Sequence, residues 1–306
     1  MKKLMTTMLL LMVTVIMSAQ VKISPKYKKG DNMLYRSTIV TTTAGKNINF
    51  VTDIRYKVLE ASSKGYTIEV TSEKAESDAA SNDLTGRLLN LTAEMMTNIK
   101  GVYTTDADGK VTGIKNYEEM KEKTLENIDK LMDGLFKELP EEASQILSKD
   151  MVKNSMTEKL TQEYLIEVTG NSPSPLTLNG KVLSTGYTDA STTENGMKIT
   201  NTYTLVTPDA SKVQVTGKLN MSKEDMKKMI IDQVKSIMPD QVEMIEQNIE
   251  SVMESGMMKM ERTQTTDYEF FPNGWVKNIS YTYDINTAGS ASAVNGKIEL
   301  VESNRK

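Results

Sequence analysis

Residues 104–114 read TTDADGKVTGI and residues 269–279 read EFFPNGWVKNI. In each stretch a turn dipeptide, Asp-Gly at 108–109 or Asn-Gly at 273–274, separates two short runs of β-forming residues. Asp-Gly and Asn-Gly accept the positive φ angles of a type I′ turn, which joins neighbouring antiparallel strands. The two stretches align at the glycine, at the valine two residues later and at the final isoleucine. The sequence therefore predicts one β-rich unit that occurs twice.

Alternation of apolar and polar residues predicts further strands around these hairpins. The clearest case is residues 48–58, where most even-numbered positions are apolar, and residues 66–70 continue the pattern. Residues 197–205, 213–219 and 279–285 show a similar alternation in the second half. A period of two with one apolar face indicates a sheet that is buried on one side. Because every recognisable connection between strands is a tight turn, the strands should be antiparallel.

A period of three to four residues predicts helices between the groups of strands. Apolar stripes run through residues 84–99 and 128–139 in the first half, and through 226–237 and 242–253 in the second. Amphipathic helices that lie between strands with one apolar face bury both surfaces by packing on that face. We therefore expect an α+β fold with an antiparallel, curved, half-barrel-like sheet, amphipathic helices on one face, and an internal duplication.

The first residues have the pattern of a secretory signal peptide. Lys2 and Lys3 precede an apolar stretch at 4–17, and small residues at 18–20 allow cleavage after Ala19. The apolar stretch is shorter than the about 20 residues that a membrane-crossing helix needs. No cysteine follows it, which excludes lipid attachment of the bacterial-lipoprotein type. We expect an exported protein, periplasmic or secreted, that is neither lipid-anchored nor integral to the membrane.

The Gly-Asn-Ser-Pro-Ser-Pro run at 170–175 is the best candidate for a linker, because it gathers residues that favour turns near the middle of the chain. The expected organisation is a signal peptide at 1–19, a first α+β repeat at 20–170 and a second at 171–306. The two repeats could be separate or form one continuous domain.

Composition excludes several functions. Removal of Lys2 and Lys3 with the signal peptide leaves 35 basic and 41 acidic residues, a net charge of −6, which argues against binding of nucleic acid. The chain has no histidine and no cysteine, so histidine-dependent triads, thiol catalysis and histidine or thiolate metal sites are impossible. No G-x-G spacing is present for a dinucleotide fingerprint. We expect a non-enzymatic protein with no catalytic residue, no cofactor and no metal site.

Two acidic features have simple structural interpretations. The Asp-Ala-Asp-Gly sequence at 106–109 shares two carboxylates with a calcium loop but lacks its third acidic position and terminal glutamate, so a plain turn is favoured. Glu141 and Glu142 follow a proline, where carboxylates in the first turn of a helix are stabilised by its dipole. A hydrolase that uses two carboxylates is a distant alternative, because nothing in the sequence pairs two such groups.

Methionine is abundant, with 22 in the chain and several between 221 and 260. Ordinary core packing is the first interpretation, because methionine fills irregular space; an adaptable apolar cavity and thioether binding of copper(I) are alternatives. If there is a cavity, it should lie between these helices and the apolar face of the sheet. The candidate lining residues are Met226, Met229, Ile230, Ile245, Ile249, Met253, Phe50, Ile54 and Tyr203.

An aromatic group between 268 and 283 includes Trp275, the only tryptophan. Packing in the core of the last sheet is the simplest interpretation. The alternative is a binding edge, because the adjacent Phe270 and Phe271 cannot both face one side of a regular strand.

The turn at 29–31, followed by Tyr35, and the later Gly-Lys-Val hairpin with Gly113 resemble exported Gram-negative envelope proteins of unknown function, which share a K-x-G-D-x-Y start and a G-K-V hairpin. The second copy departs from this pattern at Trp275 and Asn278. The expected architecture also resembles the LolA/LppX-like lipoprotein carriers, and that resemblance implies a half-barrel whose helices enclose a hydrophobic cavity.

Two hypotheses of function follow. The first is a non-enzymatic exported protein that binds an acyl chain or another apolar ligand between the sheet and the methionine-rich helices. The second is an envelope scaffold or protein-interaction module that docks a partner through strand edges or residues 270–275.

Overall fold

A computed structural model of the chain describes residues 20–43, 46–80, 84–138, 148–158, 160–192, 198–219, 223–237, 242–254, 260–287 and 290–305. The predicted signal peptide and the acidic pair at 141–142 lie outside the described residues. None of the described helices is both long enough and apolar enough to cross a lipid bilayer.

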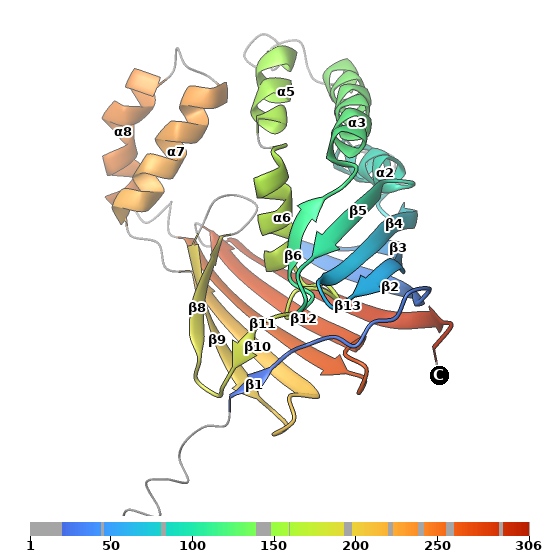
Figure 1. Cartoon of the computed structure of the whole chain (residues 1–306). Coiled ribbons are helices and arrows are strands. Elements are labelled where there is room, and N and C mark those ends of the chain that lie inside the picture. Colours follow the sequence, from blue (N-terminus) through green and yellow to red (C-terminus); the bar gives the residue numbers. More distant parts are fainter. Residues whose placement is uncertain are drawn as a thin grey trace, which may run out of the picture.

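Within the described chain, eleven strands form one antiparallel sheet that curves strongly (Figure 1). In spatial order the strands are β6 (Val111–Ile114), β5 (Lys100–Thr105), β4 (Gly65–Ser77), β3 (Lys46–Ser62), β2 (Asn32–Thr43), β13 (Ser290–Ser303), β12 (Val276–Thr287), β11 (Met260–Phe270), β10 (Lys212–Leu219), β9 (Lys198–Leu205) and β8 (Thr188–Thr192). The sheet is open, with β6 and β8 at its two edges. The predicted curved antiparallel sheet is confirmed.

Six helices and a second, two-stranded sheet complete the described structure. The small sheet pairs β1 (Val21–Lys22) with β7 (Val182–Leu183). The helices are α2 (Leu84–Met96), α3 (Tyr117–Glu138), α5 (Lys149–Thr157), α6 (Gln162–Asn171), α7 (Lys223–Ile237) and α8 (Val242–Glu254). Together with the sheet they confirm the predicted α+β class.

The two aligned hairpins, β5–β6 and β11–β12, have the same local geometry. Gly109 and Gly274 have φ angles of 82° and 83°, as expected for their turns. The turns are not type I′, because Gly109 N donates to Asp106 O at 3.1 Å and Gly274 N donates to Phe271 O at 2.9 Å. Each glycine therefore follows the two central residues, as in a type I turn closed by a glycine bulge. The strand register shifts at aligned positions, Thr104/Thr105 and Glu269/Phe270.

The carboxylates of the first hairpin are occupied by the chain itself. Asp106 Oδ1 accepts hydrogen bonds from the backbone nitrogens of Asp108 and Lys110, at 2.9 and 3.0 Å. Asp108 pairs with Lys22 Nζ at 2.6 Å. Side-chain bonding of this kind stabilises a turn and needs no metal ion. The geometry agrees with the plain-turn interpretation.

The two halves of the chain follow one order of elements. In the first half β2, β3 and β4 are followed by α2 and then by the β5–β6 hairpin; in the second β8, β9 and β10 are followed by α7, α8 and the β11–β12 hairpin. Both series run across the sheet in the same direction, and β13 lies between them. A duplicated unit would show this order, and duplication remains our prediction.

Both halves share one sheet. β13, from the second half, pairs with β12 on one side and with β2 of the first half on the other, for example through Gly296 opposite Ile39. Residues 170–175, predicted as a linker, end α6 and begin a series of turns. Pro175 is buried, and so is Leu176, which follows it. This segment is therefore part of the packed structure.

The helices differ in what they pack against. α2 contacts β4, and α3 contacts α2 and β5. α6 contacts both β6 and β8, and it stands between these two edges of the open sheet (Figure 1). α7 and α8 contact mainly each other, and α7 also contacts α5. The expectation that all amphipathic helices cover the sheet is therefore wrong for the α7–α8 pair. These two helices pack on each other and on α5 instead of on the sheet.

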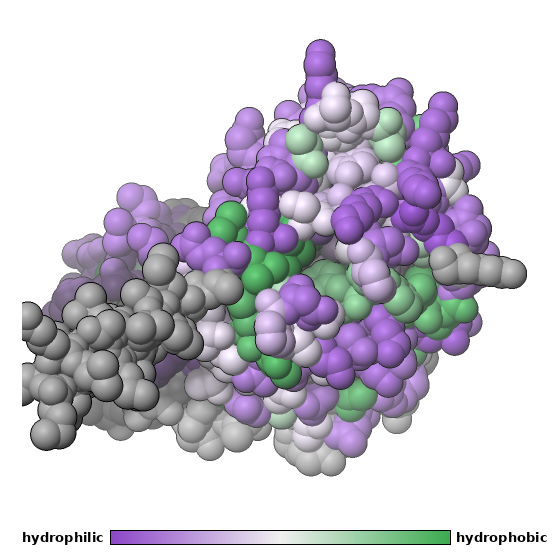
Figure 2. Space-filling model, turned by 60° about the horizontal axis from the view of Figure 1, so that its bottom comes forward, coloured by the Kyte–Doolittle hydropathy of each residue, from purple (hydrophilic) through white to green (hydrophobic). Residues whose placement is uncertain are grey.

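An aromatic core fills the end of the sheet near β1, and we define it by Tyr27, Tyr35, Tyr56 and Trp275. Trp275 has no exposed surface, its ring stacks on Tyr27 at a centroid distance of 4.1 Å, and its Nε1 donates to Asp31 Oδ2 at 3.0 Å. Trp275 is thus a core residue and cannot form a docking surface. Seen toward this end, most of the surface is hydrophilic, with hydrophobic side chains gathered in a band (Figure 2).

Candidate functional site

A hollow of about 490 Å³ lies on the inner side of the curved sheet, and we call it the inner hollow. Strands from both halves form its walls, and α6, the following residues 172–175 and the end of α2 contribute the remainder. Its apolar and aromatic lining consists of Tyr35, Ile39, Phe50, Ile54, Tyr56, Met96, Val168, Ile199, Tyr281, Tyr283 and Ile298. Its volume and mainly apolar lining are typical of sites for small organic ligands.

Strand alternation explains how the lining is assembled. On β2 the side chains of Tyr35, Ser37 and Ile39 line the inner hollow, whereas those of Thr38 and Val40 line a depression on the opposite face. Successive strand residues point to opposite faces, so the apolar positions of a period-two pattern collect on one side. The sequence prediction placed Phe50 and Ile54 on this face, and both line the inner hollow.

α6 holds its position over the inner hollow through both edges of the sheet. Thr161 caps its first turn by accepting a hydrogen bond from Tyr164 N at 3.2 Å. Gln162 Oε1 accepts a hydrogen bond from Ile114 N of β6 at 2.9 Å, which fixes the helix to that edge. Val168 and Asn171 then contribute to the lining of the inner hollow. The roof of the site is therefore α6, a helix that the sequence prediction did not single out.

A glycine on β13 makes room on the floor of the inner hollow. Gly296 lies opposite Tyr281 of β12, and a Cβ atom added to Gly296 would lie 1.9 Å from the Tyr281 ring. The tyrosine ring therefore lies flat across the glycine instead of standing upright in the site. Any side chain at position 296 would push the ring into the inner hollow.

The aromatic core closes one end of the inner hollow and contributes no charge to it. The Tyr35 hydroxyl donates to Val276 O at 2.7 Å. Burial raises the pKa values of Tyr35 and Tyr56 well above the usual value of a phenol, so both hydroxyls stay neutral. This end of the site is suited to an apolar group.

Arg262 provides a cation at the other end of the inner hollow. The residue is 8 % exposed and lies on β11. Its guanidinium carbon is 4.8 Å from the centre of the Tyr283 ring, a cation–π contact. Its Nε atom is buried and has no hydrogen-bond partner, and among the described residues no carboxylate forms an ion pair with it. The strands predicted from the sequence do not include residue 262, and nothing in the sequence singled out Arg262.

The predicted helix residues lie elsewhere. Met226 and Ile249 are buried, and Met229, Ile230 and Ile245 are half-buried, in the α7–α8 pair. Lys227 Nζ joins the two helices through Glu250 at 2.6 Å. Among the described residues, none from α7 or α8 lines the inner hollow, because these helices do not lie over it. The side chain of Met253 lies outside the description.

Tyr203 lies beside the inner hollow, in a cavity of about 30 Å³ that shares Gln264 and Tyr283 with it. Its hydroxyl is held between Lys181 Nζ, at 2.9 Å, and Asp189, at 3.0 Å. Burial, and then the Asp189 carboxylate, raise the pKa of Tyr203 far above the usual value. Since the polar groups of this cluster satisfy one another, we interpret it as structural.

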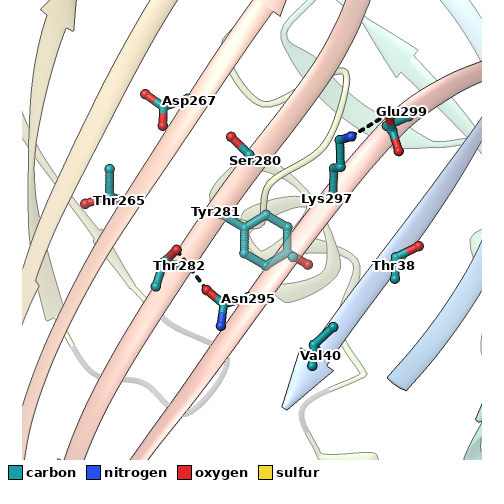
Figure 3. Close-up of a pocket in the computed structure, with 11 residues that line it drawn as sticks. Thr38, Val40, Thr265, Asp267, Ser280, Tyr281, Thr282, Asn295, Lys297 and Glu299 are labelled. Carbon is teal, nitrogen blue, oxygen red and sulfur yellow. Dashed lines mark hydrogen bonds and ion pairs between the residues drawn. The ribbon is translucent and has the colours of Figure 1, made fainter. Parts of the chain in front are cut away.

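The opposite face of the same strands has a different chemistry. Figure 3 shows a depression there that is lined mainly by threonine, asparagine and charged side chains of β2, β11, β12 and β13. Thr282 Oγ1 donates to Asn295 Oδ1 at 3.2 Å, and Lys297 pairs with Glu299 at 2.7 Å. These side chains pair among themselves, as on an ordinary hydrated surface. The inner hollow is therefore the better candidate for a ligand site.

No protein-family model matches the chain, and no curated protein matches it in sequence. Among solved structures the chain is similar to one described as lipid–protein interactions in lipovitellin, with a TM-score of 0.37 and 10% sequence identity. The match covers 91% of this chain and 26% of that chain, so this chain spans about a quarter of the length of that protein. A likeness this distant leaves the nature of any ligand to be inferred from the site itself.

Proposed function

We propose that the protein binds an apolar ligand with a single acyl chain, or a molecule of similar shape, in the inner hollow and catalyses no reaction. The observation that carries the proposal is a space of about 490 Å³ with eleven apolar or aromatic side chains in its lining. This volume lies within the about 300–1,000 Å³ typical of small-molecule sites. Its size favours one chain over a bulky multi-chain lipid.

The hydrophobic effect supplies the driving force. Each methylene group that leaves water contributes about 0.8 kcal/mol, so ten buried methylenes contribute roughly 8 kcal/mol before the cost of immobilisation. Phe50, Ile54 and Ile298 offer such a chain an apolar surface, and the rings of the neutral tyrosines in the aromatic core extend this surface.

Export is the second part of the proposal. Lys2, Lys3 and the apolar stretch at 4–17 support transport out of the cytoplasm. The proposed setting is therefore the periplasm or the extracellular space, where a soluble carrier can hold an acyl chain in water. Edman or mass-spectrometric sequencing of the exported protein should find Gln20 at the N-terminus; an uncleaved Met1 would contradict this part.

Occupation of the inner hollow can be tested with two substitutions on one strand. Ile39→Trp fills the inner hollow, whereas Val40→Trp places the same side chain on the opposite face of β2. We expect the purified protein to bind dodecanoate in isothermal titration calorimetry, and Ile39→Trp to weaken binding at least tenfold while Val40→Trp leaves it within twofold. Equal binding by both variants, or no binding of any single-chain amphiphile by the wild type, would refute the proposal.

A further inference from the structure

Arg262 is an unusual residue to find in an apolar site. More than nine-tenths of its surface is buried, and neither an acceptor for its Nε nor a counter-charge is present in the described part of the chain. A guanidinium is always ionised in a protein, and burial of an unpaired charge is strongly unfavourable. The contact with the Tyr283 ring offsets only part of that cost, because the ring supplies no hydrogen-bond acceptor. The site is therefore incomplete without an anion.

The position of Arg262 gives the inner hollow a polarity along its length. Tyr35 of the aromatic core donates to Val276 O at the start of β12, whereas Arg262 pairs in register with Ile285 near the end of the same strand, so these two lining residues lie toward opposite ends of the inner hollow. Tyr56 packs beside Tyr35 at the first end, and Gln264, on the same face of β11 as Arg262, lines the wall near the second. One end of the hollow is thus apolar and closed, and the other is cationic and polar.

We propose that the ligand is an anionic single-chain amphiphile whose head group pairs with Arg262 and whose chain extends toward the aromatic core. This inference rests on the proposed function and specifies its ligand class. The planar guanidinium donates two parallel hydrogen bonds to a carboxylate or a phosphate, so either head group would supply the missing acceptors. A neutral alcohol of equal chain length would fill the apolar end and leave Arg262 unpaired.

The test compares head groups on one chain length. Dodecanoate, dodecyl phosphate and dodecanol are titrated calorimetrically into the wild type, Arg262→Gln, and the matched control Arg36→Gln. Arg36 lies on the outer face of β2, and its side chain is half-exposed and paired with Asp53. We expect the wild type and Arg36→Gln to bind at least one anion at least tenfold more tightly than dodecanol. Arg262→Gln should lose this preference and retain dodecanol binding. The two anions distinguish a carboxylate head from a phosphate head.

Each outcome decides a separate point. Equal affinity for anions and dodecanol in the wild type, unchanged by Arg262→Gln, would overturn the role of Arg262 and leave the proposed function intact. Failure of all three ligands to bind would overturn the proposed function itself. If Arg262→Gln does not fold, Arg262→Met supplies an apolar side chain of similar length, and Arg262→Lys keeps the charge without the planar fork. With Arg262→Lys we expect anion binding between that of the wild type and that of Arg262→Met.

Discussion

The helices inserted into the two halves of the chain occupy corresponding places and pack in different ways. In the first half, α2 connects β4 to β5; in the second half, α7 and α8 connect β10 to β11. We call these helical connections the first and the second insertion. The first insertion, α2, contacts β4 of the sheet, and α3 packs on α2. In the second insertion, α7 and α8 contact mainly each other, and α7 also contacts α5. An apolar stripe thus predicts that a helix is buried without indicating against which element. The following predictions test how independent the two insertions are.

The largest loss of stability should come from a substitution in the aromatic core of the sheet, because both insertions are connected to strands of that sheet. Trp275→Ala leaves a large cavity beside Tyr27 and removes the hydrogen bond to Asp31. We expect it to lower the free energy of unfolding by about 3–5 kcal/mol in urea denaturation. Val301→Ala, at a position that is 48% exposed on β13, is the control and should change it by less than about 0.5 kcal/mol.

Met132 in α3, which packs on the first insertion, and Ile249 in α8 of the second insertion are both buried, at 2% and 1% exposure, so their substitution compares the surroundings of the two insertions. Each substitution to alanine should cost about 2–4 kcal/mol in its own environment. Hydrogen exchange should show faster opening of α2, α3 and β5 in Met132→Ala, but only of residues 223–254 in Ile249→Ala. Faster exchange throughout the sheet in Ile249→Ala would show that the α7–α8 pair is energetically part of it.

Ligand binding should depend on α6 and should not depend on the α7–α8 pair. Lys218 pairs with Thr263 across β10 and β11, so a short glycine–serine linker can replace residues 220–259. We expect this deletion to leave dodecanoate binding within twofold. Val168→Pro should weaken binding at least tenfold, because proline breaks α6 above the inner hollow. Binding is measured by calorimetry on the folded deletion variant. Loss of binding would show that the α7–α8 pair contributes to the ligand site.

The smallest effect should occur on the outer face, away from both insertions. Two hydrogen bonds from Arg36, both at 2.8 Å, hold the pKa of Asp53 below its usual value. The pair therefore contributes stability above the pKa of an unfolded aspartate and loses it as the pH falls through the lowered folded value. Because Arg36 is half-exposed, Asp53→Asn should cost less than about 1 kcal/mol at pH 7, and this cost should shrink as the pH falls below the pKa of an unfolded aspartate. A larger cost in urea denaturation, or one that persists in acid, would contradict this assignment.

The sequence predicts features that depend on neighbouring residues. Alternation through residues 48–58 correctly places Phe50 and Ile54 on the inner face, and the turn glycines Gly109 and Gly274 have the expected positive φ angles. The predicted turn type is wrong, because Asp106 and Phe271 accept the closing hydrogen bonds one residue earlier than a type I′ turn requires. A dipeptide signals a turn, but its exact hydrogen bonding depends on the side chains around it.

The sequence could not predict which helix covers the site. α6 is short and has a weak apolar stripe, and its role depends on contacts with β6 and β8, which are far apart along the chain. Arg262 was missed for a related reason. It follows Glu261 and alternates with threonines, like a surface residue, and its burial results from Tyr283 and from strands that only the folded sheet brings near. Long-range packing decides both features, and local periodicity does not report it.

The contact of α6 with both β6 and β8 has a consequence for the behaviour of the protein in solution. An open sheet presents unpaired backbone groups at each margin, and such margins recruit strands from other molecules into aggregates and fibrils. A single helix that touches both margins makes each less accessible to a foreign strand. Detachment of this one helix would therefore expose both edges to foreign strands at once.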